Sequence, residues 1–360
     1  MKKYKYNICC FVNDIPTSQS GPNKSLNLMF KKVFKKKKNI FLFFKFKNSF
    51  FMNNKKFGIL DVFKFLNKSK IIYLNGVYSF SHFLFPLIIA IYVKPKIIIS
   101  PRGMLGEEAF VKSKYKKLIY LFFLNFFLKL FKKKDIIFHA TSIKEKVDIK
   151  NIIKCDPKSI KMIPNLNITN IKFLKKNKKK NLAKFFYFSN ITSKKNLGTF
   201  IEAMKKTGIK SKNMSLDVYG KVIERKYYNY LKFLIKTNNL NVFFKNEIPN
   251  DEVQKIQKNY HFLAHPSHGE NYGHTIVECL SAGIPSIISD NTPWSDYDSN
   301  FDGLVHPSIL PDQLSRSLKF FYSINNKKYQ MLKKSSYTYF KKFILSNESK
   351  NIKLYNNLFS

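Results

Sequence analysis

The sequence predicts an α/β protein with two parallel sheets, each covered on both faces by helices. Short apolar runs of strand length alternate with longer segments of helical periodicity along the whole chain. The expected strands cover residues 7–12, 70–74, 96–100, 135–139 and 160–163, then 184–188, 216–219, 241–244, 261–264 and 285–289. The expected helices cover residues 112–131, 197–205, 224–236, 274–282 and 312–322. Two such series indicate two Rossmann-like domains with a cleft between them, and ligands in such sheets bind at the carboxyl ends of the strands.

The domain boundaries follow from polar runs between these elements. The chain begins with a charged stretch and a short apolar run, which indicates a first strand rather than a signal peptide. The lysine-rich run at 31–38 extends an apolar segment and is interpreted as the frayed end of a helix. Residues 173–181 are polar without apolar periodicity, which is typical of a linker. We therefore expect a first Rossmann-like domain at 1–175, a second Rossmann-like domain at 176–345, and a final segment, 346–360, that can cross back to the first domain.

The composition excludes several classes of protein. A hydrophobic content of 44%, with 37 Phe and 20 Tyr, excludes a disordered chain. The longest apolar runs, 83–93 and 118–128, are much shorter than the roughly 20 residues of a membrane-spanning helix. The four cysteines show neither metal-ligand spacing nor a disulfide framework, which favours a reducing, cytoplasmic compartment.

The charge is strongly positive, with 65 Lys and Arg against 22 Asp and Glu and a net charge of +43. Only Arg102, Arg225 and Arg316 are arginines, whereas a nucleic-acid-binding surface is expected to use arginine heavily. Because the lysines occur in every segment, we interpret them as a bias of the whole sequence and expect no nucleic-acid partner. The positive field still attracts the protein to anionic membranes and phosphorylated ligands.

The densest group of functional residues follows the strand expected at 261–264. A polar loop holds Glu270 and Gly273, and a helix begins at His274–Thr275. The amides at a helix start, next to a glycine that lets backbone approach closely, form an anion site. Glu278 lies one turn into this helix. Both glutamates can therefore face one ligand that has its phosphate at the helix start.

This motif resembles that of the family 4 retaining glycosyltransferases. Glu270 and Glu278 are separated by seven residues, within Pro-Ser-x-x-Glu-x-x-Gly and followed by Ala-Gly-x-Pro. The family has the GT-B fold, in which two Rossmann-like domains face a cleft, and it uses nucleotide-diphosphate sugars without a metal. Further pieces occur in the family's order: Gly21-Pro-x-Lys-Ser25, Ser100-Pro-Arg-Gly-Met-Leu105, Ala140-Thr-Ser142, Ile163-Pro-Asn165 and Lys194-Lys-Asn196.

The resemblance also implies an activity and roles for individual residues. It implies transfer of a hexosyl group to an acceptor hydroxyl with retention of configuration, in cell-surface polysaccharide or lipopolysaccharide assembly. The donor is a nucleotide sugar, the acceptor is a glycan or lipid-linked, and no cofactor is needed. The implied catalytic residues are Glu270, Lys195 and Arg102. The implied donor-binding residues are Glu278, Gly273, His274, Thr275, Asn190 and Gly21, with Glu107 and Asn75 on the acceptor side.

The chain departs from the family pattern at several positions. Ser189-Asn190 stands where many members have Gly-Arg, so one of two cations expected at the pyrophosphate is missing. Asn75-Gly76 and Arg102-Gly103 each stand where many members have His-Gly. A sugar-nucleotide-binding protein without activity therefore remains an alternative, and a basic nucleic-acid-binding protein, suggested by charge alone, is a less favoured one. A Rossmann oxidoreductase ranks lower, because the chain lacks the glycine fingerprint of that class.

Metal binding is not expected, although two patterns suggest it. His261, His265, His268 and His274 lie near Cys279, but they span a strand, a loop and a helix start without paired-ligand spacing. Of these histidines, His268 is interpreted as the one that touches a ligand. Asp296-Tyr-Asp298 mimics a metal-binding Asp-x-Asp, and we interpret it as a helix cap.

A membrane-docking helix is predicted between Lys112 and Lys134. Its middle is apolar nearly all round and lysines cluster at both ends, which favours the cytoplasmic face of an anionic membrane. The alternative is a helix buried between the sheet and its neighbours.

Overall fold

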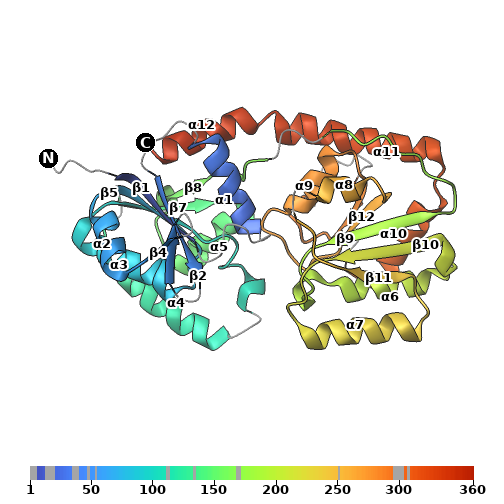
Figure 1. Cartoon of the computed structure of the whole chain (residues 1–360), viewed down its shortest axis with the longest axis horizontal. Coiled ribbons are helices and arrows are strands. Elements are labelled where there is room, and N and C mark those ends of the chain that lie inside the picture. The colour runs from blue at the N-terminus through green and yellow to red at the C-terminus, as the bar shows by residue number, and fades with distance from the viewer. Residues whose placement is uncertain are drawn as a thin grey trace. The chain divides into compact units, whose positions relative to one another are not determined.

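The computed structural model describes residues 6–12, 21–34, 40–46, 49–52, 55–110, 114–132, 135–167, 172–249, 252–294, 304–305 and 309–360. The chain divides into two compact units (Figure 1). Unit 1 comprises Met1–Leu166 together with Glu348–Ser360, and unit 2 comprises Asn167–Asn347. The division thus falls after Leu166, before the boundary expected at residue 175.

Within the described part of the chain, unit 1 contains an eight-stranded sheet. Its strands are β1 (Tyr6–Val12), β2 (Ile40–Phe46), β3 (Ser49–Met52), β4 (Lys55–Phe57), β5 (Ser69–Asn75), β6 (Lys96–Ser100), β7 (Ile136–Ala140) and β8 (Ile160–Met162). The spatial order is β4-β3-β2-β1-β5-β6-β7-β8. The pairs from β2 through β1 to β8 are parallel, as expected, and β2-β3 and β3-β4 add an antiparallel edge that was not predicted. The physical reason is that two-residue connections join these strands, and connections that short cannot cross over to a parallel neighbour.

Helices cover both faces of the unit 1 sheet (Figure 1). They are α1 (Gly21–Lys32), α2 (Ile59–Asn67), η1 (Phe80–Leu84), α3 (Phe85–Val93), η2 (Glu107–Phe110), α4 (Lys114–Leu128), α5 (Ile143–Ile153), η4 (Pro157–Ser159) and α12 (Glu348–Leu358). Side chains alternate along β5: Ile72 and Leu74 join the core with α2, α3 and α4, whereas Tyr73 meets Phe359, just after α12, at 5.5 Å between ring centroids. An ion pair of Lys32 and Glu348 at 2.7 Å also holds the final segment on unit 1.

Unit 2 is built on a sheet in which, among the described residues, six strands all run parallel. They are β9 (Ala183–Phe188), β10 (Met214–Tyr219), β11 (Val242–Lys245), β12 (Phe262–His265), β13 (Ser286–Ile288) and β14 (Leu304–Val305), in the order β11-β10-β9-β12-β13-β14. The helices are η5 (Ser193–Lys195), α6 (Leu197–Thr207), η6 (Ser211–Asn213), α7 (Arg225–Thr237), α8 (Val253–Gln257), α9 (His274–Ser281), α10 (Pro311–Ser323), α11 (Asn326–Tyr339) and η7 (Phe340–Leu345). In Figure 1, α6 and α7 cover one face of this sheet, and α8 and α9 cover the other.

The lysine-rich run at 173–181 packs on unit 2 and is not a free linker. Lys178 is buried, and its ammonium donates to the carbonyl oxygens of Tyr322 and Ile324 at the carboxyl end of α10. Unpaired carbonyls and the helix dipole make that end of a helix a favourable site for a cation. Burial lowers the pKa of Lys178 to about 8. Residues 173–181 are therefore polar in sequence but pack specifically on unit 2 through Lys178.

Two buried histidines, one in each unit, are held neutral by the fold. In unit 1, His139 Nε2 donates to Ile163 O at 3.0 Å, and burial and the nearby Arg102 lower its pKa to about 3. In unit 2, His261 Nδ1 accepts from the Lys184 amide at 3.1 Å, and burial and nearby lysines lower its pKa to about 3. An unfolded histidine titrates near pH 6.5.

We expect acid to destabilise the protein through these two histidines. Between pH 6.5 and pH 3 the unfolded chain binds more protons than the folded one, so stability falls as the pH falls through this window. Between pH 7 and pH 5.5 each histidine should cost about 1 kcal/mol in the free energy of unfolding. Urea denaturation at both pH values measures the difference. His139→Asn or His261→Asn should reduce it, and His268→Asn, at an exposed position, should not. An unchanged difference in both buried variants would contradict the assignment.

Candidate active site

Two residues implied in catalysis are in direct contact at the carboxyl edge of the unit 2 sheet. Lys195 ends η5, which follows β9, and Glu270 lies in the loop after β12, the neighbouring strand. Lys195 Nζ forms an ion pair with Glu270 Oε1, and His265 Nε2 lies 2.7 Å from the same oxygen. Parallel strands end at the same edge of a sheet, so residues 75 positions apart in the chain meet here.

The Glu270 carboxylate is ionised in this environment. Burial by itself raises its pKa, but the Lys195 ammonium and the hydrogen bond from His265 outweigh burial and hold the pKa well below its usual range. The side chains are 13% exposed for Glu270 and 21% for Lys195, so water screens the pair only weakly. A ligand hydroxyl that reaches Glu270 therefore meets a hydrogen-bond acceptor and not a proton donor.

His265 contacts Glu270, although the sequence analysis favours His268 for ligand contact. His265 is buried, and its Nδ1 has no hydrogen-bond partner among the described residues. His268 is exposed, and its backbone amide donates to Lys194 O at 3.0 Å. The sequence feature that could have identified His265 is its position as the last residue of β12, because the carboxyl end of a parallel strand lies on the ligand side of the sheet.

Helix α9 begins at the predicted anion site. Gly273 has a φ of 75°, in the left-handed region that strains residues with a side chain, so this turn favours glycine. His274 and Thr275 precede Ile276, whose N–H makes the first bond of the helix, to Gly273 O at 3.0 Å. Thr275 Oγ1 donates to Phe188 O at 3.3 Å, which ties the start of α9 to the end of β9.

The remaining donor-side residues of unit 2 lie close to this edge in the fold. Glu278 is buried on α9, four residues after His274 and on the same helix face. Asn190 follows β9 with its side chain exposed, and its carbonyl accepts from Tyr187 Oη at 3.0 Å. The place of the missing arginine is thus open to solvent and carries no charge.

Arg102, implied as catalytic, and Asn75, implied on the acceptor side, meet in the interior of unit 1. Arg102 donates from Nε to Asn75 Oδ1 at 2.7 Å, from Nη1 to Asn165 Oδ1 at 2.6 Å and from Nη2 to Tyr73 Oη at 2.7 Å. The guanidinium is buried. A position that faces a ligand was expected. Instead, the guanidinium is surrounded by the neutral side-chain oxygens of Asn75, Asn165 and Tyr73. In this structure Arg102 holds together the ends of β5, β6 and the segment after β8.

The remaining residues singled out in the sequence lie in helices or outside the described part of the chain. Gly21 is the first residue of α1, with Ser25 Oγ donating to its carbonyl at 3.1 Å, and so does not lie in a loop. Glu107 is the first residue of η2. Asp296 and Asp298 lie outside the described residues. Among the residues that are described, no three His, Cys, Asp or Glu side chains are grouped so as to hold a metal ion.

Several solved structures share this architecture across nearly the whole chain. HepE of Anabaena, in complex with UDP and glucose, matches with a TM-score of 0.76 and 13% identity, over 97% of this chain and 98% of that one. Sucrose-phosphate synthase from Thermosynechococcus elongatus matches with a TM-score of 0.73 and 11% identity, over 98% and 99%. WaaG, a glycosyltransferase involved in lipopolysaccharide biosynthesis, matches with a TM-score of 0.67 and 13% identity, over 97% of this chain and 99% of that one. The chain therefore has the GT-B fold.

The part of the chain that carries the two glutamates is similar to a known protein family. Residues 168–339, which include Lys195, Glu270 and Glu278, match the family model of the glycosyl transferases group 1. No curated protein sequence matches the chain significantly. The matched segment lies within unit 2 and covers slightly less than half of the chain.

Proposed function

We propose that this chain is a retaining enzyme that moves a hexosyl group from a nucleotide-diphosphate sugar to a hydroxyl of a glycan or lipid-linked acceptor. The observation that carries the proposal is the Lys195–Glu270 ion pair, with His265 on the same carboxylate oxygen, beside the start of α9. HepE binds UDP and UDP-glucose in its structures, which supports a nucleotide sugar as the donor.

The donor's charged and neutral parts need different partners, and unit 2 offers both. The Lys195 ammonium and the amides at Gly273–Thr275 are donors for a diphosphate. Glu278, four residues into the helix, accepts hydrogen bonds from ribose hydroxyls. Glu270 accepts from a hydroxyl of the transferred sugar, a role for which the carboxylate must be ionised. Its lowered pKa supports that role over general-acid catalysis.

The chemistry follows from where charge develops. As the bond between the sugar carbon and the phosphate oxygen breaks, its electron pair moves to the phosphate and positive charge grows on the sugar. The Lys195 ammonium stabilises the negative charge that develops on the phosphate. The acceptor oxygen attacks the sugar carbon from the face that the phosphate leaves, so configuration is retained. The acceptor's proton passes to the departing phosphate oxygen, which balances the reaction without a protein base.

A divalent metal is not needed in this proposal. In metal-dependent transferases a cation neutralises the diphosphate, and here the Lys195 ammonium and the α9 amides take that part. Of the Glu270 carboxylate, Oε1 already contacts both Lys195 and His265.

The test is a screen of nucleotide sugars that detects the released nucleoside diphosphate. At least one donor should be consumed, with the configuration at the sugar carbon unchanged in the product, and excess EDTA should leave the rate within about twofold. Loss of turnover in EDTA that manganese or magnesium restores would refute metal independence. Tight donor binding without any release, in the presence of a broad acceptor mixture, would favour the inactive binding protein that Asn190 suggests.

We also propose that unit 1 attaches the enzyme to the cytoplasmic face of a membrane that holds a lipid-linked acceptor, in polysaccharide or lipopolysaccharide assembly. Helix α4 buries only Leu121 and Leu124 among its described side chains. Its exposed apolar side chains are Leu118, Ile119, Phe122, Phe123 and Phe126. A helix buried between sheet and neighbours would not leave these rings in water, and a large exposed apolar face is typical of an interaction site. Within the described residues no helix is long and apolar enough to cross a bilayer.

Liposome flotation tests the membrane attachment. We expect the protein to float with anionic vesicles at low salt, and less with neutral vesicles or at moderate salt. Phe123→Ser should weaken binding about tenfold or more, because one inserted aromatic ring contributes about 1.5–3 kcal/mol. Phe233→Ser on α7, an equally exposed ring, is the matched control and should have no effect. Protein that stays at the bottom with anionic vesicles at low salt would make a soluble acceptor the better hypothesis.

A further inference from the structure

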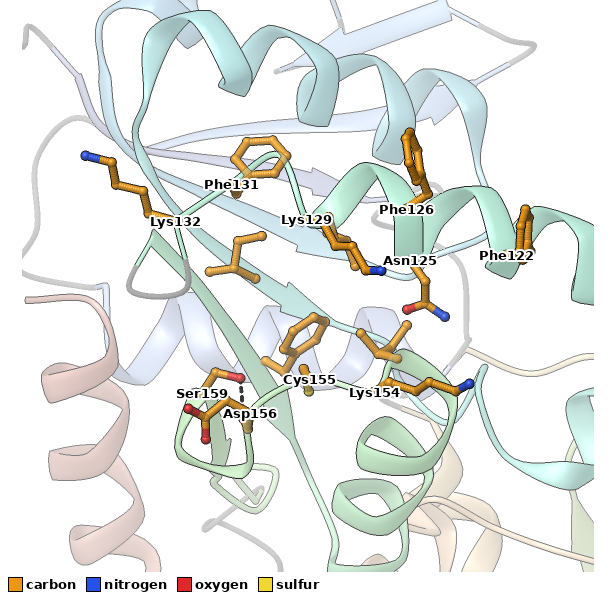
Figure 2. Close-up of a pocket in the computed structure, with 14 residues that line it drawn as sticks. Phe122, Asn125, Phe126, Lys129, Phe131, Lys132, Lys154, Cys155, Asp156 and Ser159 are labelled. Carbon is orange, nitrogen blue, oxygen red and sulfur yellow. Dashed lines mark hydrogen bonds between the residues drawn. The ribbon is translucent and has the colours of Figure 1, made fainter.

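A pocket of about 770 Å³ lies in unit 1 between the carboxyl ends of α4 and α5 (Figure 2). The volume is in the range of about 300–1,000 Å³ that is typical of small-molecule sites. Buried Ile136, Phe138 and Ile153 line it, and Phe122 and Phe126 continue it onto the exposed face of α4. An apolar cavity thus opens directly onto the surface that we propose to meet the membrane.

The pocket also carries positive charge. Lys129 and Lys132, after α4, and Lys154, after α5, are exposed side chains of its lining. Asp156 is the acidic residue of the lining, and its carboxylate accepts from the Lys158 amide at 2.9 Å. No ion pair with an acid is found for these lysines among the described residues. The pocket therefore pairs an apolar interior with a net cationic margin.

A polar atom inside the pocket still has unused hydrogen-bonding capacity. Asn125 of α4 donates from Nδ2 to Ile152 O at 2.9 Å, which bridges the two helices. Its Oδ1 is buried and has no hydrogen-bond partner among the described residues. Figure 2 shows Asn125 and Lys129 on the α4 side, with Lys154 and Cys155 across the pocket. A buried acceptor without a partner costs free energy that a ligand hydroxyl can recover.

The position of the pocket separates it from the acceptor side of the active site. It lies against Ile136, the first residue of β7, and Ser159, just before β8. Asn75 is the last residue of β5 and Arg102 follows the carboxyl end of β6, and both strands run parallel to β7 and β8. The pocket is therefore at the amino edge of the sheet, opposite the edge where Rossmann-like domains bind reactants.

From these features we propose that the pocket anchors a membrane lipid, with one hydrocarbon chain of the lipid in the apolar interior and its phosphate at Lys129, Lys132 and Lys154. This rests on the proposed membrane attachment and adds a specific site to it. The lipid is bound and not consumed, because it lies at the edge remote from the reactants. Withdrawal of a chain into the protein would hold unit 1 at the bilayer longer than surface insertion of α4 alone.

Cys155 is a native reporter for the test, since it is half-exposed in the pocket and Cys9, Cys10 and Cys279 are buried. Alkylation of Cys155 is followed by mass spectrometry at about pH 8.5, because burial raises the pKa of this thiol. Octyl and decyl phosphate should protect Cys155, with the half-protecting concentration about fifteenfold lower for the decyl chain. Inorganic phosphate should not protect. Equal protection by decyltrimethylammonium, which has the same chain and the opposite charge, would overturn the proposal.

Variants then separate the pocket from the exposed face. Lys154→Asn keeps a residue that tolerates the left-handed backbone at this position (φ 52°) and should raise the half-protecting concentration of decyl phosphate about fivefold. Lys146→Asn, on α5 but outside the lining, should not. Phe123→Ser should weaken flotation and leave protection unchanged, because Phe123 is outside the lining. Flotation of the wild type without protection by decyl phosphate would overturn the lipid pocket and leave membrane attachment standing. Protection without flotation would support the pocket and contradict the attachment.

Discussion

Replacing Lys195 by alanine is expected to lower turnover by about 100- to 1,000-fold, the usual loss for one preorganised group that stabilises transition-state charge. The effect should lie at the upper end, because the neighbouring position expected to share the charge is Asn190, which is neutral. The substitution also removes the ammonium that pairs with Glu270, so the carboxylate keeps only His265 of the two partners seen here. Turnover is measured as nucleoside diphosphate released at saturating donor.

Lys194→Ala is the matched control for this experiment. Lys194 is the adjacent residue in η5, its side chain is exposed, and its contact with the loop before Glu270 uses the backbone carbonyl, which alanine retains. It should keep turnover within about twofold. If Lys195→Ala were also within a few-fold of the wild type, Lys195 would have no place in the site.

Replacing Gly220 by alanine is expected to cost more than about 3 kcal/mol in the free energy of unfolding of unit 2. Gly220 follows β10 at a φ of 151°, and a Cβ there would lie 1.9 Å from Ser189 O, a backbone atom at the end of β9. The clash cannot be relieved by a side-chain rotation. It would have to displace the turn that leads from β9 towards Lys195, so activity should fall together with stability.

Gly208→Ala separates backbone strain from close approach. Gly208 caps α6 at a φ of 68°, and a Cβ there meets nothing within 4 Å. It should cost only the left-handed strain of alanine, about 1 kcal/mol. Urea denaturation of both variants gives the comparison. Equal losses would mean that Gly220 is required for its φ alone and that the contact with Ser189 has no consequence.

Much of the architecture could be predicted because buried strands have a strong local signature. Runs such as Ile97-Ile-Ile99 and Phe185-Phe-Tyr187 are apolar on both faces, as strands between two layers of helices must be. The weaker elements were not predicted. Strands β2, β3 and β4 form the antiparallel edge, where lysines interrupt the apolar pattern, and the assignment of 173–181 as a linker missed the burial of Lys178.

The candidate active site also has a part that could be predicted from the sequence and a part that could not. The motif around Glu270 and Glu278 is local in sequence, since it needs a strand end, a glycine turn and a helix start within a short segment. Its spacing predicted the helix start at His274, where the structure places it. The role of Arg102 could not be predicted from nearby residues, because its partners Tyr73, Asn75 and Asn165 lie far from it in the chain. An arginine in a polar loop suggests an exposed cation, but here it is a buried hydrogen-bond donor.

By itself the sequence determined the class of fold, the order of most strands and helices, and the segment that carries the two glutamates, because periodicity and turn chemistry act between residues close in the chain. Only the tertiary structure decided that Lys195 and His265 share one oxygen of Glu270, that Arg102 is interior, and that the ends of α4 and α5 enclose a pocket. Each of these depends on which strand ends and helix ends become neighbours when the sheet forms. A one-dimensional pattern does not contain that information, since the contacts join residues as far as 75 positions apart.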